Sequence, residues 1–86
     1  MESFETMDKF EVFPNPLRQG ENLFVHSFSN MLPVKVKISD LRGNEKLHFT
    51  LRKFSVSMQV NLPLGSYFIT LAHGSIYEEK KILVVY

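Results

Sequence analysis

Apolar and polar residues alternate with a period of two along most of this chain. The longest run covers residues 54–62, where Phe54, Val56, Met58, Val60 and Leu62 alternate with polar residues. Because successive side chains of a strand point to opposite faces, this period predicts β-strands. We expect strands near residues 10–13, 23–28, 34–40, 45–51, 54–62, 66–72 and 76–85. No comparable stretch has helical periodicity.

Turn residues separate these strands. The carboxylate of Asp40 is placed to accept a backbone N–H two residues on, and Gly43 can supply a positive φ, so residues 40–44 predict a tight hairpin. A second hairpin turn is expected at residues 73–75. Prolines interrupt the chain only between expected strands, because they cannot donate to a ladder; they are Pro14, Pro16, Pro33 and Pro63.

These features predict an all-β chain, an immunoglobulin-like antiparallel β-sandwich of about seven strands. Residues 10–86 form the domain, and the acidic residues 1–9 are expected to be a linker. The predicted core consists of the inward-facing strand residues, namely Val25, Val36, Ile38, Phe49, Val56, Met58, Val60, Tyr67, Ile69 and Leu71.

The last expected strand is apolar on both faces. Its final five residues, Ile82, Leu83, Val84, Val85 and Tyr86, directly follow Lys80 and Lys81. Alternation places Ile82, Val84 and Tyr86 on one face and Leu83 and Val85 on the other. A two-layer sandwich buries only one face of a strand. The second face therefore needs a cover, either from this chain or from a partner protein.

Composition limits the function classes. The chain has 86 residues, a net charge of +1 and no cysteine. That length suits one domain, and the charge gives no reason to expect nucleic acid or an anionic membrane as a partner. Disulfides and thiolate chemistry are excluded. The first 20 residues lack the features of a secretory signal, so an exported protein would carry its entry signal in a longer chain.

Catalytic and metal-binding patterns receive little support. The histidines at positions 26, 48 and 73 are spread over separate strands or turns without ligand spacing. Ser55 and Ser57 have no His/Asp motif nearby. Glu78 and Glu79 are adjacent in a strand and so point to opposite faces. We therefore expect no enzyme activity, no cofactor and no metal.

Five short motifs occur in an order that resembles a known family. They are Val12-Phe13-Pro14-Asn15-Pro16, Gly20 with Leu23, Val36 to Gly43 ending in Asp40-Leu41-Arg42-Gly43, Leu62-Pro63-Leu64-Gly65-Ser66-Tyr67, and Lys80-Lys81-Ile82-Leu83-Val84-Val85. Each motif alone is weak evidence for a family. Together they cover residues 10–86 and resemble the C-terminal sorting domain (type A) of the type IX (Por) secretion system of Bacteroidota. Many members end on a basic residue, whereas this chain ends on Tyr86.

The resemblance implies a secretion signal that works as a folded domain behind a covalently linked N-terminal passenger. Such passengers reach the periplasm by a signal peptide and then cross the outer membrane. The implied partners are an outer-membrane shuttle barrel and a sortase-like peptidase, which usually removes the domain and attaches the passenger to lipopolysaccharide at the cell surface. In a minority of members the domain is retained.

The resemblance and the apolar last strand together assign candidate roles to named residues. Recognition by the translocon is expected at Lys80, Lys81, Ile82, Leu83, Val84, Val85 and Tyr86, with Gly65 and Tyr67 as secondary candidates. The structural motif residues are Pro14, Asn15, Pro16, Asp40, Gly43, Leu62 and Pro63. For Gly65 and Tyr67, a turn glycine and a core aromatic are the stronger interpretation.

Two further hypotheses remain open. The chain could be an autonomous immunoglobulin-like adhesive or carbohydrate-binding module, for which Phe24, His26 and Phe28 are the candidate stripe. It could also self-associate by pairing edge strands between copies, since exposed edges favour such pairing.

Overall fold

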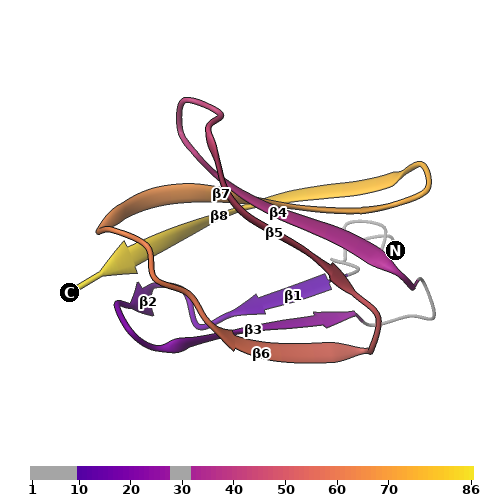
Figure 1. Cartoon of the computed structure of the whole chain (residues 1–86), viewed down its shortest axis with the longest axis horizontal. Helices are drawn as coiled ribbons and strands as arrows, with labels where there is room; N and C mark the ends of the chain where they lie inside the picture. Colours follow the sequence, from indigo (N-terminus) through magenta and orange to yellow (C-terminus); the bar gives the residue numbers. More distant parts are fainter. Residues whose placement is uncertain (1–9, 28–31) are drawn as a thin grey trace, which may run out of the picture.

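The chain folds into two β-sheets that face each other (Figure 1). The computed structural model describes residues 10–27 and 32–86. One sheet has the strand order β1-β3-β6 and the other has the order β2-β8-β7-β4-β5. The strands are β1 (Phe10–Phe13), β2 (Leu17–Arg18), β3 (Asn22–Ser27), β4 (Val34–Asp40), β5 (Glu45–Leu51), β6 (Ser55–Gln59), β7 (Gly65–His73) and β8 (Ile76–Val85). The predicted all-β sandwich is confirmed.

One strand was not predicted. β2 has only two residues, too few to show a period, and its Leu17 and Arg18 lie opposite Val84 and Val85 of β8. The two strands run parallel, whereas the other strand pairs of the described residues are antiparallel. The fold therefore has eight strands rather than seven, and its larger sheet is mixed. The described residues contain no helix that is long and apolar enough to cross a membrane.

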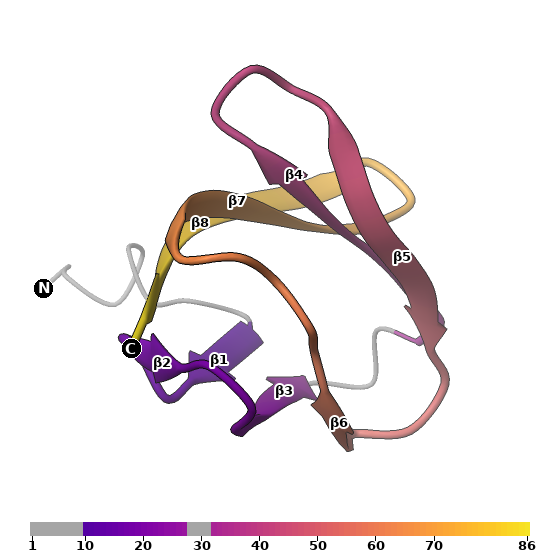
Figure 2. The same cartoon turned by 60° about the vertical axis from the view of Figure 1, so that its left-hand side comes forward.

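The strand expected at residues 54–62 is shorter than predicted. β6 covers Ser55–Gln59, and Phe54 before it is 51% exposed rather than facing the core. After Gln59 the chain leaves the smaller sheet and crosses to β7 in the larger one (Figure 2). Val60 and Leu62 lie in this crossing segment and remain buried. The alternation persists because the segment passes along the edge of the core.

The core lies between the two sheets. Of the predicted core residues, Phe49, Val56 and Met58 are only partly buried, whereas the other seven are buried. The three lie on β5 and β6, which are outermost strands of their sheets and are covered less completely. The buried apolar residues are Phe10, Leu17, Leu23, Val25, Val34, Val36, Ile38, Leu51, Val60, Leu62, Tyr67, Ile69, Leu71, Ile82 and Val84.

The hairpin between β4 and β5 has the predicted chemistry. Oδ1 of Asp40 accepts the backbone N–H of Arg42 and of Asn44, each at 2.9 Å. Gly43 has a φ of 90° and donates its N–H to the Asp40 carbonyl at 3.0 Å. Nothing lies within 4 Å of the position that a Cβ of Gly43 would take, so backbone conformation alone selects glycine here.

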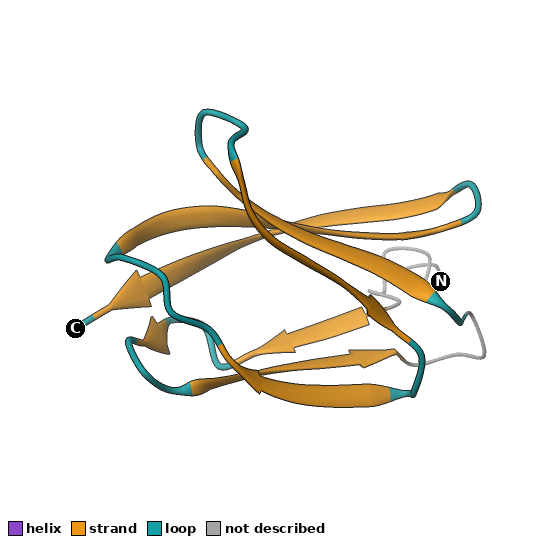
Figure 3. Ribbon diagram, viewed as in Figure 1, coloured by secondary structure: helices purple, strands orange, loops and turns teal. Residues whose placement is uncertain are grey.

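The remaining turns also follow the sequence. A two-residue turn, Gly74-Ser75, joins β7 to β8, and the four prolines all lie in connections between strands (Figure 3). Residues 1–9, expected to be a linker, lie outside the described residues.

Candidate functional site

The end of β8 presents apolar side chains on both faces, as the sequence predicted. Ile82 and Val84 are buried between the sheets, while Leu83 is 43% exposed and Val85 is partly exposed on the outer face. Tyr86 was expected beside Ile82 and Val84. It instead follows the last residue of β8 and is 93% exposed, because the sandwich does not extend past the end of the strand.

The outer face of β8 is continued by β7. Ser66 lies opposite Leu83, and the partly buried Phe68 lies opposite Lys81. We call Lys81, Leu83, Val85 and Phe68 the outer β8 face. Phe68 was not among the predicted site residues, although its alternation with Ile69 already indicated that it points away from the core.

Residues 15–19 cover the edge of β8 beside this face. The side-chain amide of Asn15 donates from Nδ2 to the carbonyl of Lys81 at 2.9 Å, and its Oδ1 accepts the N–H of Leu83 at 3.1 Å. Gln19 donates its backbone N–H to the carbonyl of Val85 at 2.8 Å. Because the prolines on both sides of Asn15 have no N–H, its carboxamide takes the place of a strand backbone.

This arrangement closes the edge of β8 over residues 81–85. β7 pairs with the other edge from Ile76 to Val84. Pairing of the last strand between two copies, one of the hypotheses from the sequence, therefore finds no free edge there while residues 15–19 stay in place.

The two lysines before the apolar residues point in different directions. Lys81 is exposed on the outer face. Lys80 lies on the inner side of the strand, where its Nζ is 3.9 Å from Oε1 of Glu78 and both side chains are 20% exposed. The structure therefore brings Lys81, but not Lys80, to the outer β8 face.

Tyr67 lies in the core and not on the surface of the domain. It is buried in the core, and its hydroxyl donates to the carbonyl of Pro63 at 2.7 Å. Burial raises the pKa of the Tyr67 phenol, and the nearby Asp40 carboxylate adds to the effect. Any part that Tyr67 plays in recognition must therefore act through the loop that it holds. Gly65, with a φ of 147°, ends that loop opposite Val84.

The Asp40 hairpin and the loop before β7 meet at this end of the molecule. They line a common hollow, and Leu41 on one side and Leu64 on the other are 57% and 53% exposed. Two of the sequence motifs, far apart along the chain, thus form one surface near the end of β8. The sequence contained both motifs but gave no signal that they touch.

The residues considered for catalysis are dispersed. His26, His48 and His73 lie on β3, β5 and β7, and the described residues contain no group of three metal-ligating side chains. His48 contacts Glu45, and Nδ1 of His73 lies 2.9 Å from the Pro33 carbonyl. Ser55 and Ser57 are exposed on β6, and Ser57 accepts a hydrogen bond from the Asn22 amide.

In the stripe considered for carbohydrate binding, Phe24 has an aromatic partner within the domain. Phe24 stacks on Phe13 of the neighbouring strand, with ring centroids 5.2 Å apart and planes 5° from parallel. Each ring therefore gives one face to the other rather than to a ligand. Phe28 lies outside the described residues.

Comparison with known proteins identifies the family. No curated protein matched the chain. The family model described as a secretion system C-terminal sorting domain matches residues 11–85, which include every described strand except the first residue of β1. This is a family of sorting signals, not of catalysts, and membership implies interaction with the type IX machinery and export to the cell surface or the extracellular space. The chain therefore belongs to the C-terminal sorting domain family of the type IX secretion system.

Proposed function

We propose that the outer-membrane shuttle barrel of the type IX system recognises this domain through the outer β8 face. The observation that carries the proposal is Leu83, a large apolar residue that is 43% exposed near the C-terminal end of a regular strand. Phe68 and Val85 extend the same surface. Residues 10–86 act as the signal, behind a passenger that enters the periplasm by its own signal peptide.

The closed edge of β8 favours a face over an edge as the docking element. A partner strand that added to residues 81–85 would first have to displace Asn15 and β2. It would break the three hydrogen bonds from Asn15 and Gln19 and also the pairing of β2 with β8. A partner that covers Leu83 and Val85 from outside leaves these bonds intact. Burial of apolar surface would then drive binding.

Lys81 places a positive charge at the rim of this surface. It is exposed next to Leu83, so an acidic group on the shuttle would be attracted to it and would orient the complex. Lys80 contributes to the domain itself through Glu78. After translocation, a sortase-like peptidase removes the domain and attaches the passenger to the surface.

An export assay tests the role of the outer β8 face. A reporter with a signal peptide is fused in front of residues 1–86 and expressed in a bacterium that has a type IX system. In the double variant Leu83→Glu/Val85→Glu, we expect the reporter to accumulate in the periplasm, because two carboxylates would have to be desolvated on docking. Ser55→Glu, on an exposed strand of the other sheet, is the matched control and should be exported.

Folding is measured separately, by thermal unfolding of the purified domain. Normal export of a folded double variant would refute recognition through this face. A double variant that no longer folds is replaced by Leu83→Ser, which removes the apolar side chain without introducing a charge. Normal export of that folded variant would refute the proposal equally.

A further inference from the structure

A second surface, at the other end of β8, has a different chemistry. The strand registers place Tyr77, Ala72, Lys35 and Thr50 in one row across β8, β7, β4 and β5. Two adjoining hollows on this outer face share Lys35, Thr50 and Ala72, so they form one continuous groove. The floor of the groove at Ala72 is a methyl group, which is much shorter than the neighbouring side chains of Tyr77 and Lys35.

We propose that this groove binds an acidic saccharide, that is, a sugar chain carrying carboxylate or phosphate groups. The inference goes beyond the sorting role and does not depend on it. Tyr77 and Leu83 are six residues apart on β8, so their backbones lie about 20 Å apart.

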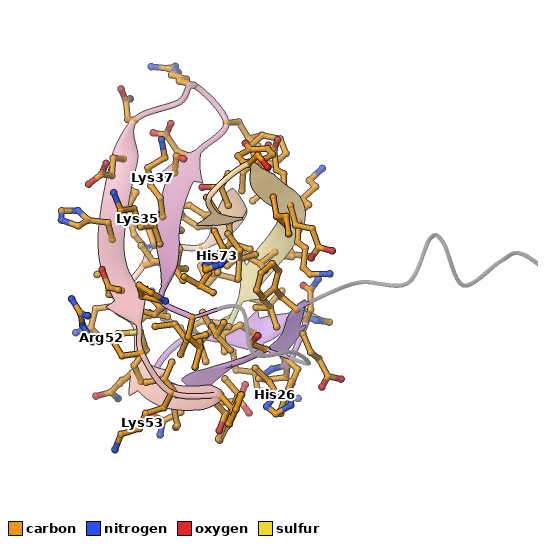
Figure 4. The ribbon with its side chains drawn as sticks, turned by 90° about the vertical axis from the view of Figure 1, so that its right-hand side faces the viewer. His26, Lys35, Lys37, Arg52, Lys53 and His73 are labelled. Carbon is orange, nitrogen blue, oxygen red and sulfur yellow. The ribbon has the colours of Figure 1, made fainter. Side chains whose placement is uncertain are left out.

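The positive charge of the groove comes from Lys35, Lys37 and Arg52. Figure 4 shows these side chains following one another along the β4–β5 side of the molecule. All three are exposed, and none of them forms an ion pair within residues 10–27 and 32–86. Several positive side chains that line one groove attract an anionic ligand, because the groove focuses their electric field.

The acidic residues nearest to the groove do not neutralise it. Glu45 contacts His48, and Asp40 lies 3.7 Å from Lys46 near the hairpin. Glu79 occupies the same row as Lys37 but two strands away, at the border of the groove. The centre of the groove is therefore cationic, and the ligand must carry the opposite charge.

The neutral residues of the groove distinguish a sugar from other anions. Tyr77 is 61% exposed and offers an aromatic face with a hydroxyl at its tip. Neighbouring strands lie about 4.8 Å apart, so the backbones at Tyr77 and Lys35 are separated by roughly 9.6 Å, with Ala72 between them. A sugar ring fits above Ala72, its C–H face against Tyr77 and its acidic group at Lys35. A polyglutamate peptide has no ring to stack on the side chain of Tyr77, so the aromatic residue favours a sugar.

Titration of the ¹⁵N-labelled full chain at low salt tests this proposal. The probes are a hexamer of galacturonate, the neutral maltohexaose and a hexaglutamate peptide. We expect the galacturonate hexamer to shift the amide signals of Lys35, Ala72 and Tyr77, and to bind at least about tenfold more tightly than maltohexaose.

Variants separate the two parts of the ligand. Lys35→Gln/Lys37→Gln should weaken binding of both anionic probes by about tenfold or more. Tyr77→Ala should weaken binding of the galacturonate hexamer but leave that of hexaglutamate unchanged. Arg18→Gln, an exposed cation on β2 outside the groove, is the matched control and should change neither. All four proteins are compared by thermal unfolding.

Two results would overturn the proposal. Absence of binding by the galacturonate hexamer at millimolar concentration would show that the groove is not a saccharide site. Binding of hexaglutamate that is as tight as that of the galacturonate hexamer, with no effect of Tyr77→Ala on either, would assign the groove to an acidic protein segment instead. Neither result would affect recognition through Leu83 and Val85, which is measured by export.

Discussion

Two turns of this molecule use one side chain to satisfy backbone groups, but over very different distances in sequence. In the β4–β5 hairpin, the Asp40 carboxylate accepts N–H groups from Arg42 and Asn44. Beside β8, the Asn15 carboxamide bonds the carbonyl of Lys81 and the N–H of Leu83, 66 and 68 residues away. The first motif completes itself, whereas the second needs the finished fold.

The choice of side chain follows from the groups to be satisfied. The hairpin offers only N–H donors to residue 40, and a carboxylate, which only accepts, suits them. The edge of β8 offers one acceptor and one donor, so residue 15 must both donate and accept, as a carboxamide does. Asn15→Asp in the covering segment, residues 15–19, should therefore destabilise the fold more than Asp40→Asn in the hairpin.

The largest expected difference concerns apolar anchoring. Leu17 in the covering segment is 1% exposed, whereas Leu41 in the hairpin is 57% exposed. Leu17→Ala should lower the free energy of unfolding by about 2–5 kcal/mol, because it leaves a cavity beside Val84. Leu41→Ala should change it by less than about 0.5 kcal/mol. Urea denaturation of both variants measures the difference.

Equal effects of the two substitutions would contradict this comparison. A loss below about 1 kcal/mol for Leu17→Ala would mean that β2 adds little to the fold and that the edge of β8 opens readily. Recognition through that edge would then have to be considered in place of the outer face.

A smaller effect is expected from the polar exchange Asn15→Asp. The variant keeps an acceptor for Leu83 but loses the donor to Lys81 and sets a carboxylate oxygen near a carbonyl. We expect a loss of about 0.5–1.5 kcal/mol at neutral pH, the typical worth of one hydrogen bond. The carboxylate is disfavoured in the folded state, so its folded pKa should be raised, and the loss should diminish as pH falls through that pKa.

Asn22→Asp is the matched control for this exchange. Asn22 donates from Nδ2 to the hydroxyl of Ser57 at 3.1 Å, and a hydroxyl can rotate to donate to a carboxylate instead. The control should therefore cost less than Asn15→Asp. If both variants lose the same stability at neutral pH, the strand-like role of the Asn15 carboxamide is wrong.

The same contrast explains which features were predictable from the sequence. The hairpin, the turn at Gly74 and the alternating strands depend on neighbouring residues, and they were predicted correctly except for the length of β6. β2 was missed because two residues show no period, and Asn15 was assigned to a structural motif without its partners in β8. The family was predictable because motif order is itself a property of the sequence. The groove at Lys35 and Tyr77 was not, because the row that forms it joins four strands.

The smallest effect is expected from Asp40→Asn, and its pH dependence identifies the cause. The Asn44 N–H, and then the Asn44 side chain, the Arg42 N–H and Lys46, lower the pKa of Asp40 below its usual 3.8. A lowered folded pKa contributes stability that is present above pH 3.8 and is lost as pH falls through the folded pKa. The wild-type advantage in stability over Asp40→Asn should therefore be present at neutral pH and shrink in acid, because the wild type loses stability there.

In Asn15→Asp the difference in stability from wild type closes for the opposite reason, since the variant regains stability in acid. Melting temperatures of wild type and both variants across the acid range, with the exposed Glu79→Gln as control, separate these cases. A gap for Asp40→Asn that is independent of pH would show that the hairpin depends on the geometry of the side chain and not on its charge.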